Sequence, residues 1–381
     1  MYLENLHLRS FRNYRDTRVD FETQKTILVG NNAQGKSNLL EAVELLSTLK
    51  SRRANRDREL VLEGENTGQV IAKINRAYSK AELVLTFRKK GRRTVTLNGE
   101  SLRRHLDFLG ALNTVQFSSL DLELVRGAPE CRRHWLDALV IQLEPIYAHI
   151  LYQYSQVLRQ RNALLKKIRQ SESPTEIGDS EMAQLKLWDE QLATTGSRVT
   201  RRRARVVARL APLCRTWHSG ISGKTEVLGI KYAPNVVWGE DDPAHVQQAF
   251  LEKIEERRVV EVHQGRTVVG PHRDEVELTI NDTPARSYGS QGQQRTLVLA
   301  LKLAELNLIE EVVGEPPLLL LDDVLAELDP HRQQQLLATI GDRFQTLITT
   351  THLHSFDSQW LSNSQIISIE GGKIKPVIGY Q

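Results

Sequence analysis

Cysteine is scarce in this chain: Cys131 and Cys214 are the only two, they lie far apart, and neither belongs to a C-x-x-C pair. Two reduced, partly buried thiols are the simplest expectation, with a disulfide or a metal site as the lesser alternative. No run of 18 apolar residues occurs, so we expect no transmembrane helix. The first residues mix acids and bases where a signal peptide has an apolar segment. These absences predict a cytoplasmic protein.

A large excess of charge of one sign is also lacking. The chain has 51 Lys+Arg against 47 Asp+Glu, for a formal net charge of +4. This margin is too small to indicate nucleic-acid binding, so any such argument depends on where the basic residues cluster. Aromatic residues make up 6% and are not interleaved with the basic clusters. Stacking on single-stranded bases is therefore not expected to dominate.

The length of 381 residues is enough for two folding units. Residues 1–128 and 265–381 combine β-type apolar runs with helical patterns, which predicts one α/β lobe built from both ends of the chain. Residues 129–264 have mainly helical patterns, with a polar break at Ser171–Ser180. Pro145, Pro174 and Pro212 are expected to interrupt these helices, and no sustained heptads are present. The prediction is an α/β lobe with an inserted, mainly helical lobe.

A phosphate-binding loop is the clearest motif. GNNAQGKS matches G-x-x-x-x-G-K-[ST] between an apolar strand pattern and an amphipathic helix pattern. Glycines let backbone N–H groups turn toward phosphates, and the helix N-terminus adds positive potential. Lys36 is expected to reach the β- and γ-phosphates of ATP, and the Ser37 hydroxyl to bind Mg²⁺. The predicted nucleotide-binding residues here are Gly30, Asn31, Asn32, Ala33, Gln34, Gly35, Lys36, Ser37 and Asn38.

Two carboxylates follow the apolar run Leu318–Leu321. In P-loop enzymes the first carboxylate after such a strand binds Mg²⁺ through water, and the next can polarise the attacking water. We therefore assign Asp322 to the metal and Asp323 to catalysis, together with Lys36. Because aspartate is shorter than the glutamate usual in ABC-type ATPases, slow hydrolysis is expected.

A second anion-binding motif lies upstream of that run. Residues 290–293, SQGQ, open a long apolar helix and resemble the S-x-G-Q signature of ABC-type ATPases. Ser290, Gly292 and Gln293 are its candidate residues, although an ordinary helix N-cap has the same pattern. Since Lys36 and Ser37 already hold one γ-phosphate, the signature is expected to serve the ATP of a second subunit. This predicts an ABC-type P-loop ATPase head that forms an ATP-dependent homodimer.

Three further residues fit the same ATPase pattern. Gln116 resembles the glutamine that reaches Mg²⁺ and links the lobes, so we assign it to both the metal and catalysis. Asp329 resembles the residue that abuts the dimer interface. His352 follows an apolar strand pattern at the place of a switch histidine on the γ-phosphate, and a solvated loop histidine is the alternative.

The separation of Lys36 from Asp323 is too long for a transporter nucleotide-binding domain and too short for an SMC-type coiled coil. The sequence instead resembles the RecF family of bacterial recombination-repair ATPases nearly end to end. The matching segments are LRSFRNY, GNNAQGKSNLLEAV, GAPECRRHWLD, QRNALLK, GPHRDEVEL, GSQGQQRTLVLALKLAE and LLLLDDVLAELD. Ala33 departs mildly from the glycine usual in SMC-type loops.

This resemblance implies ATP-dependent dimerisation on DNA at the single-strand junctions of gaps. It also implies cooperation with RecR and RecO in loading RecA, and weak, DNA-stimulated ATPase activity. Arg12, in the family's FRN motif, is implied to lie near the nucleotide.

A basic helix face is the candidate DNA contact. Arg198, Arg201, Arg202, Arg205 and Arg209 share one face at helical spacing. Such a face can neutralise the phosphates of a duplex without reading bases, although a solvated face without a partner has the same pattern. Two other functions remain open: a nucleotide-gated protein-interaction switch without DNA contact, and an ATPase fused to a nuclease. The second is disfavoured because few residues follow Asp329.

Overall fold

A computed structural model describes residues 1–170, 178–223, 226–325, 328 and 330–375. The chain divides into two compact units: Met1–Val125, Thr216–Glu226 and Ser290–Gln381 make up the first, and Arg126–Arg215 and Val227–Gly289 the second. Residues 265–289 thus cluster with the second unit. Among the described residues, no helix is long and apolar enough to cross a membrane. Neither Cys131 nor Cys214 forms a disulfide.

The first unit contains a largely parallel sheet with the order β15-β14-β3-β13-β12-β8. β14, β3, β13, β12 and β8 pair in parallel, and β15 pairs antiparallel to β14. β13 is buried throughout, as the apolar strands of parallel sheets usually are. The bounds are Lys25–Val29 (β3), Thr114–Ser118 (β8), Leu318–Asp322 (β12), Thr346–Thr350 (β13), Gln365–Glu370 (β14) and Lys373–Lys375 (β15).

The second sheet of this unit is antiparallel, with the order β2-β1-β4-β5-β6-β7. Buried and more exposed residues alternate along β5, so that one face packs on the core. Asn98 (φ 52°) and Gly99 (φ 83°) connect β6 to β7 with the two positive φ angles that a tight hairpin turn needs. The bounds are Tyr2–Phe11 (β1), Tyr14–Asp20 (β2), Thr67–Asn75 (β4), Lys80–Arg88 (β5), Thr94–Leu97 (β6) and Glu100–Ser101 (β7).

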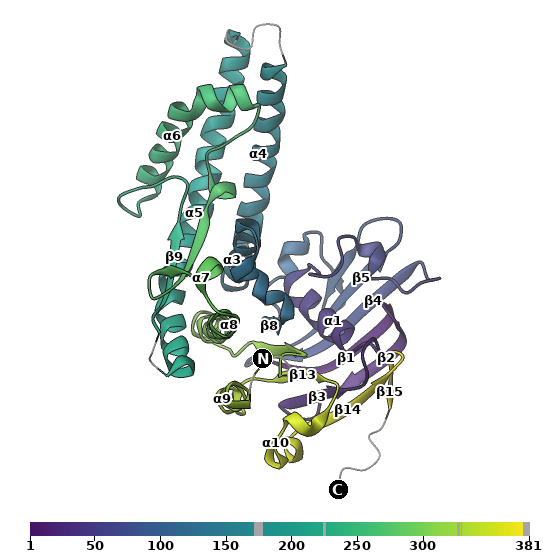
Figure 1. Ribbon diagram of the computed structural model, residues 1–381. Helices are drawn as coiled ribbons and strands as arrows, with labels where there is room; N and C mark the ends of the chain where they lie inside the picture. Colours follow the sequence, from purple (N-terminus) through teal and green to yellow (C-terminus); the bar gives the residue numbers. More distant parts are fainter. Residues whose placement is uncertain (171–177, 224–225, 326–327, 329, 376–381) are drawn as a thin grey trace. The chain divides into compact units, whose positions relative to one another are not determined.

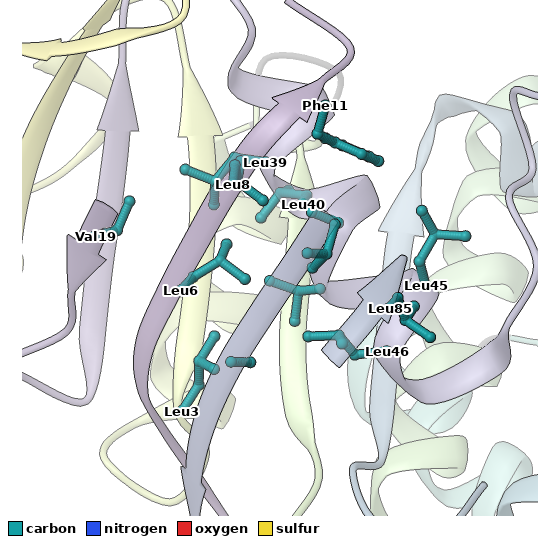
Figure 2. Close-up of a cluster of buried hydrophobic side chains, with 14 of the residues drawn as sticks. Leu3, Leu6, Leu8, Phe11, Val19, Leu39, Leu40, Leu45, Leu46 and Leu85 are labelled. Atoms are coloured by element: carbon teal, nitrogen blue, oxygen red, sulfur yellow. The ribbon is translucent and has the colours of Figure 1, made fainter. Parts of the chain in front are cut away.

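Helix α1 (Lys36–Thr48) packs against both sheets. Its leucines belong to one buried cluster with residues of the antiparallel sheet (Figure 2), and Leu318 and Leu347 of the parallel sheet belong to the same cluster. Because α1 begins inside the phosphate-loop motif, this packing fixes the direction of the loop. The labelled members of the cluster are Leu3, Leu6, Leu8, Phe11, Val19, Leu39, Leu40, Leu45, Leu46 and Leu85.

The remaining helices of the first unit lie mostly in its C-terminal part. Helix α8 (Gln291–Val313) is buried without interruption from Thr296 to Leu306, so it is an interior helix rather than an amphipathic surface helix. The others are α9 (Pro330–Ile340), α10 (Ser358–Ser362) and the 3-10 turns η1 (Asp57–Glu59), η2 (His105–Phe108), η3 (Ser119–Leu122) and η6 (Leu353–Ser355). Helix α2 (Glu123–Arg126) spans the boundary between the units in sequence.

The second unit is built on long helices with a small antiparallel sheet. Helices α4 and α5 run side by side (Figure 1), and the Arg161 Nε–Asp189 Oδ1 ion pair (2.8 Å) joins them. Residues of α5 from Thr216 onward cluster with the first unit. The helices are α3 (Pro129–Leu143), α4 (Ile146–Arg169), α5 (Asp179–Ser222), α6 (Pro243–Gln264) and α7 (Ala285–Tyr288), with η4 (Pro271–Arg273). The strands are β9 (Leu228–Ala233), β10 (Glu275–Ile280) and β11 (Thr283–Pro284).

The prolines of this unit did not all act as expected. Pro145 separates α3 from α4, as predicted. The prediction for Pro212 was wrong, because this residue lies inside the 44-residue helix α5. Pro212 is exposed, and its neighbours Leu210, Ala211 and Cys214 are buried. Packing of these neighbours on the apolar side therefore outweighs the lost backbone hydrogen bond. Pro174 lies outside the described residues.

Candidate nucleotide site

The phosphate-loop motif follows β3 at the carboxyl edge of the parallel sheet. Gly30 lies so close to β14 that a Cβ there would stand 2.4 Å from the Ile369 carbonyl oxygen. Gly35 has φ 116°, which only glycine adopts readily. Ala33 also lies in the left-handed region, with φ 63°. That conformation explains why glycine is usual at this place, since a Cβ there is unfavourable by roughly 1–2 kcal/mol.

Residues from both chain ends hold the loop. Asn13 Nδ2 donates to the Gln34 carbonyl (2.9 Å), and Tyr14 Oη donates to the Gly35 carbonyl (2.9 Å). Near the C-terminus, Gly372 N also donates to the Gln34 carbonyl (3.0 Å). The loop is thus fixed before any ligand binds. Asn38 Nδ2 donates to Asn13 Oδ1 (2.8 Å), so the predicted Asn38 supports the loop through this contact.

Lys36 is buried beneath its own loop, with an exposed fraction of 4%. Its ammonium donates to the carbonyls of Gly30 (2.7 Å) and Asn31 (3.0 Å). These hydrogen bonds hold the Lys36 ammonium at the loop, where it can bind a phosphate. Asn31, Asn32 and Ala33 are exposed on the outer side of the loop.

The two predicted metal ligands from opposite ends of the chain meet here. Ser37 Oγ donates to Asp322 Oδ1 at 2.7 Å, and Thr349 Oγ1 donates to the same oxygen at 2.9 Å. They meet because β3, β12 and β13 are parallel, so their carboxyl ends share one edge. A hydroxyl and a carboxylate are the oxygen donors that Mg²⁺ prefers, so these residues fit the predicted ion.

Asp323 lies beside this pair in a strained backbone conformation, with φ 53°. Its N–H donates to Thr349 Oγ1 at 2.9 Å. The pKa of the Asp323 carboxyl is raised, mainly by burial. Lys36 opposes this shift, and the neighbouring charge of Asp322 adds to it. Strain of this kind persists where the surrounding structure imposes it, and it concentrates at functional sites. A carboxyl with a raised pKa is a better proton acceptor, which suits the predicted catalytic role.

A cavity of about 250 Å³ opens beside Ser37 and the carboxylates. Gln116, in the middle of β8, lines it from the neighbouring strand and is 8% exposed. The structure therefore brings Gln116 together with the predicted metal ligands. The lining residues are Ser37, Glu41, Glu44, Arg52, Arg53, Gln116, Ser118, Ser119, Leu120, Asp322 and Asp323.

Arg12 does not line this cavity among the described residues. Its φ is 52°, and its guanidinium binds both carboxylate oxygens of Glu41 on α1, at 2.7 and 2.8 Å. Arg12 Nη1 also donates to the Glu59 carbonyl (3.0 Å). Arg12 thus anchors the phosphate-loop helix to the segment that follows it.

The signature residues form a helix cap. Ser290 is the N-cap of α8: its Oγ accepts from Gln293 N (3.2 Å), and its N–H donates to Gln293 Oε1 (2.8 Å). Gln293 Nε2 donates to Glu226 Oε1 (2.8 Å). Ser290 is exposed, and the atom nearest to a Cβ at Gly292 would be Arg332 Nη2 at 3.6 Å. Among the described residues that line the cavity, none belongs to 290–293.

The last two predicted residues have different outcomes. His352 is exposed two residues after β13, and its ring stacks on that of His354 with centroids 5.3 Å apart. The carbonyl of Thr350, the last residue of β13, accepts a hydrogen bond from Gly30 N (3.3 Å), so the chain segment of His352 comes close to the start of the loop in space. Asp329 lies outside the described residues.

Comparisons with known proteins agree with this geometry. A family model described as the RecF/RecN/SMC N terminal domain matches residues 2–374. A relative from Gloeothece citriformis (strain PCC 7424), named "DNA replication and repair protein RecF", is 71% identical over 382 residues, which cover 98% of this chain and 100% of the relative. The chain belongs to the RecF family. The resemblance inferred from the sequence motifs is confirmed.

Solved structures confirm the fold of this RecF family member. A structure of "the recombination mediator protein RecF-ATP in RecFOR pathway" matches with a TM-score of 0.89 and 32% identity, over 99% of this chain and 98% of that chain. An Smc head domain from Pyrococcus furiosus, bound to the C-terminal domain of ScpA, matches with a TM-score of 0.54 and 16% identity, over 98% and 95% of the two chains. The second match shows the fold alone. The predicted α/β ATPase head with a helical insertion is thus confirmed.

Two RecF-specific motifs, RRHWLD and GPHRD, form one network inside the second unit. Arg132 binds Glu275 through Nε and Nη2 (both 2.7 Å), and Arg133 Nη1 donates to the Asp274 carbonyl (2.9 Å). Asp137 binds Arg203 through both oxygens (2.9 and 3.0 Å). The motifs therefore hold the unit together, a role that their spacing in sequence did not reveal.

The predicted basic face of this RecF chain is partly neutralised. Arg201 and Arg205 both bind Asp241, each at 2.6 Å, and Arg202 binds Glu144 at 2.8 Å. Arg198 and Arg209 are exposed. Three of the five arginines on this face of α5 therefore form ion pairs with carboxylates.

Proposed function

We propose that this chain is an ATP-dependent recombination-repair protein that hydrolyses ATP slowly, dimerises on ATP and binds duplex DNA at the junctions of gaps. Family membership supports the role in repair. The observation that carries the nucleotide chemistry is the 2.7 Å contact between Ser37 and Asp322, which joins the phosphate loop to the carboxylate strand.

ATP binds with its phosphates in the loop. The backbone N–H groups of residues 30–37 and the N-terminus of α1 surround the phosphates, and Lys36 exchanges its carbonyl partners for phosphate oxygens. Ser37, Asp322 and Gln116 would hold Mg²⁺, which would supply positive charge beside the transferred phosphoryl group. Asp323 accepts a proton from the attacking water. Its short side chain supports slow turnover.

Dimerisation places the exposed Ser290 cap of one subunit on the ATP of the other. A Cβ at Gly292 would meet no atom closer than Arg332 Nη2 at 3.6 Å, so the backbone is not tightly covered, which supports the approach of a γ-phosphate. His352 and Asp329 belong to the same interface. ATP thus acts as the contact between two heads, and hydrolysis releases them.

DNA binds through phosphate contacts on the basic face of α5. Arg198, Arg205 and Arg209 extend into solvent, and two copies in a dimer double the positive surface. RecR and RecO are the partners that the family relationship supports, and RecA is the recombinase to be loaded.

A second candidate function is a nucleotide-gated protein-interaction switch that never touches DNA. The observation that favours it is the pairing of Arg201, Arg202 and Arg205 with carboxylates, because each pair reduces the charge available to phosphates.

Light scattering tests the nucleotide half of the proposal. The mass of the wild type is expected to double with ATP and Mg²⁺, whereas Ser290→Arg and Lys36→Arg are expected to remain monomeric. Bound ATP measured in the same samples separates the two variants, since Ser290→Arg still binds it. A wild-type mass that ATP does not change contradicts the proposal.

DNA affinity as a function of salt tests the other half. Neutralising Arg201, Arg205 and Arg209 together to glutamine is expected to abolish most ATP-dependent binding and to lower the salt slope by about 3. A matched triple variant of Arg159, Arg257 and Arg266, which are arginines of the same unit outside this face, serves as the control. Equal loss in both variants, or none in either, shows that this face of α5 is not the DNA contact, and a wild type that binds no DNA favours the interaction switch.

A further inference from the structure

A buried carboxylate lies beside the predicted cation-binding glutamine. Glu44, on α1, faces Gln116 of β8 across the wall of the cavity. In the amide orientation that satisfies both groups, Gln116 Nε2 donates to both Glu44 oxygens, at 2.7 and 2.8 Å. An amide has one donor end and one acceptor end. Glu44 therefore occupies the end that cannot bind a cation and leaves Oε1 for the cation.

Glu44 is in turn held by a chain of charged side chains. Arg52 Nε binds Glu44 Oε1 (2.8 Å), and Arg52 Nη1 binds Asp121 Oδ1 (2.8 Å). Lys302 Nζ binds the same Asp121 oxygen (3.3 Å) and also Glu305 Oε1 (3.0 Å). These ion pairs connect α1, η3 and α8 within the first unit.

Three of these four charged side chains lie almost entirely away from water. The side chains of Asp121 and Lys302 are each 2% exposed and that of Glu44 is 6% exposed, whereas Arg52 is 36% exposed. Burial raises the pKa of Glu44, and Arg52 counteracts that effect. For Asp121, burial opposes ionisation, but Lys302 and Arg52 hold its pKa below the usual value. Buried charges rarely add stability over apolar residues of the same size, so the cluster calls for another function.

We propose that Glu44 is a positioning residue for ATP hydrolysis: it fixes the amide of Gln116 so that Oε1 meets the cation, and Arg52, Asp121 and Lys302 keep Glu44 in place. This inference rests on the proposed ATPase function. Lys302 lies on the same helix that Ser290 begins. This row of ion pairs thus connects the cation site of one ATP to α8, the helix whose N-cap serves the ATP of the partner subunit.

A double-mutant cycle on Glu44 and Gln116 tests the inference. Glu44→Gln replaces an acceptor by an amide that can present either end to Gln116, so the orientation is lost while the volume is kept. We expect kcat and the apparent Mg²⁺ affinity to fall about 10- to 100-fold, as for other partners that orient metal ligands, with ATP affinity nearly unchanged. In the Gln116→Ala background, the same substitution is expected to change both quantities by less than about twofold. Glu63→Gln, an exposed glutamate outside the cavity, is the matched control.

Each outcome decides the matter. If Glu44→Gln lowers kcat equally in both backgrounds, or not at all in the wild type, Glu44 does not act through Gln116 and the inference is wrong. If the wild type does not hydrolyse ATP, the proposed ATPase function is wrong. The same double-mutant cycle is then measured through the Mg²⁺ dependence of ATP binding, which still tests the role of Glu44. If Glu44→Gln does not fold, Arg52→Gln replaces it in the cycle, because Arg52 is partly exposed and its removal leaves the packing of α1 intact.

Discussion

The partly buried imidazole of His272 makes the stability of the second unit depend on pH. His272 Nδ1 accepts a hydrogen bond from Tyr154 Oη (2.5 Å), and Nε2 donates to the Thr267 carbonyl (3.2 Å). Burial raises the pKa of Tyr154, so its hydroxyl stays protonated as the donor. Burial is also the main cause that lowers the pKa of His272, to about 4, against the opposing hydrogen bond to Thr267. The native imidazole is therefore neutral at pH 7.

The direction of the pH effect follows from proton binding. In the unfolded chain the pKa of histidine is about 6.5. Between that pH and about pH 4, the unfolded chain binds a proton that the native state does not. The free energy of unfolding therefore decreases as the pH falls through this window, and the contribution is fully present above it. With these two pKa values, the loss between pH 7.5 and 5.0 is about 2 kcal/mol.

Urea unfolding followed by circular dichroism at both pH values measures this loss. His272→Gln can keep both hydrogen bonds but does not titrate, so its difference from the wild type isolates the histidine from all other groups. We expect the wild type to lose about 2 kcal/mol more than His272→Gln on going to pH 5.0. His134→Gln, at an exposed histidine of α3, is the control and is expected to follow the wild type. The reasoning is refuted if the difference between wild type and His272→Gln is the same at both pH values.

Three other substitutions have expected outcomes. Arg161→Met leaves the buried carboxylates of Asp189 and Glu261 without their shared cation, so the free energy of unfolding in urea is expected to fall by about 3–5 kcal/mol, whereas the exposed Arg159→Met is expected to be nearly neutral. Gly30→Ala places a Cβ 2.4 Å from the Ile369 carbonyl, so ATP affinity measured by calorimetry is expected to drop, and an unchanged affinity contradicts the account of the loop. Pro212→Ala restores a backbone donor inside α5 and is expected to stabilise the protein by about 1–2 kcal/mol, whereas destabilisation argues against the explanation given for this proline.

The candidate nucleotide site could be proposed from the sequence because its signals are contiguous. The loop from Gly30 to Ser37 and the carboxylates after β12 each combine a strand pattern with the residue types that phosphate and Mg²⁺ require. Parallel pairing then brings their ends to one edge, so the meeting of Ser37 with Asp322 could be inferred without coordinates. The prediction of an α/β lobe with an inserted helical lobe came from the change in hydrophobic periodicity along the chain.

The charged side chains could not be assigned in this way. A row of arginines at helical spacing looks the same whether it faces solvent or carboxylates, and Asp241 reaches Arg201 across 40 positions of sequence. Glu44 likewise appears as one more polar residue of α1 until β8 places Gln116 beside it. A sequence motif specifies which functional groups lie close together over a short stretch of the chain. Whether a charge is paired depends on side chains that only the packing of distant elements brings within a few ångströms.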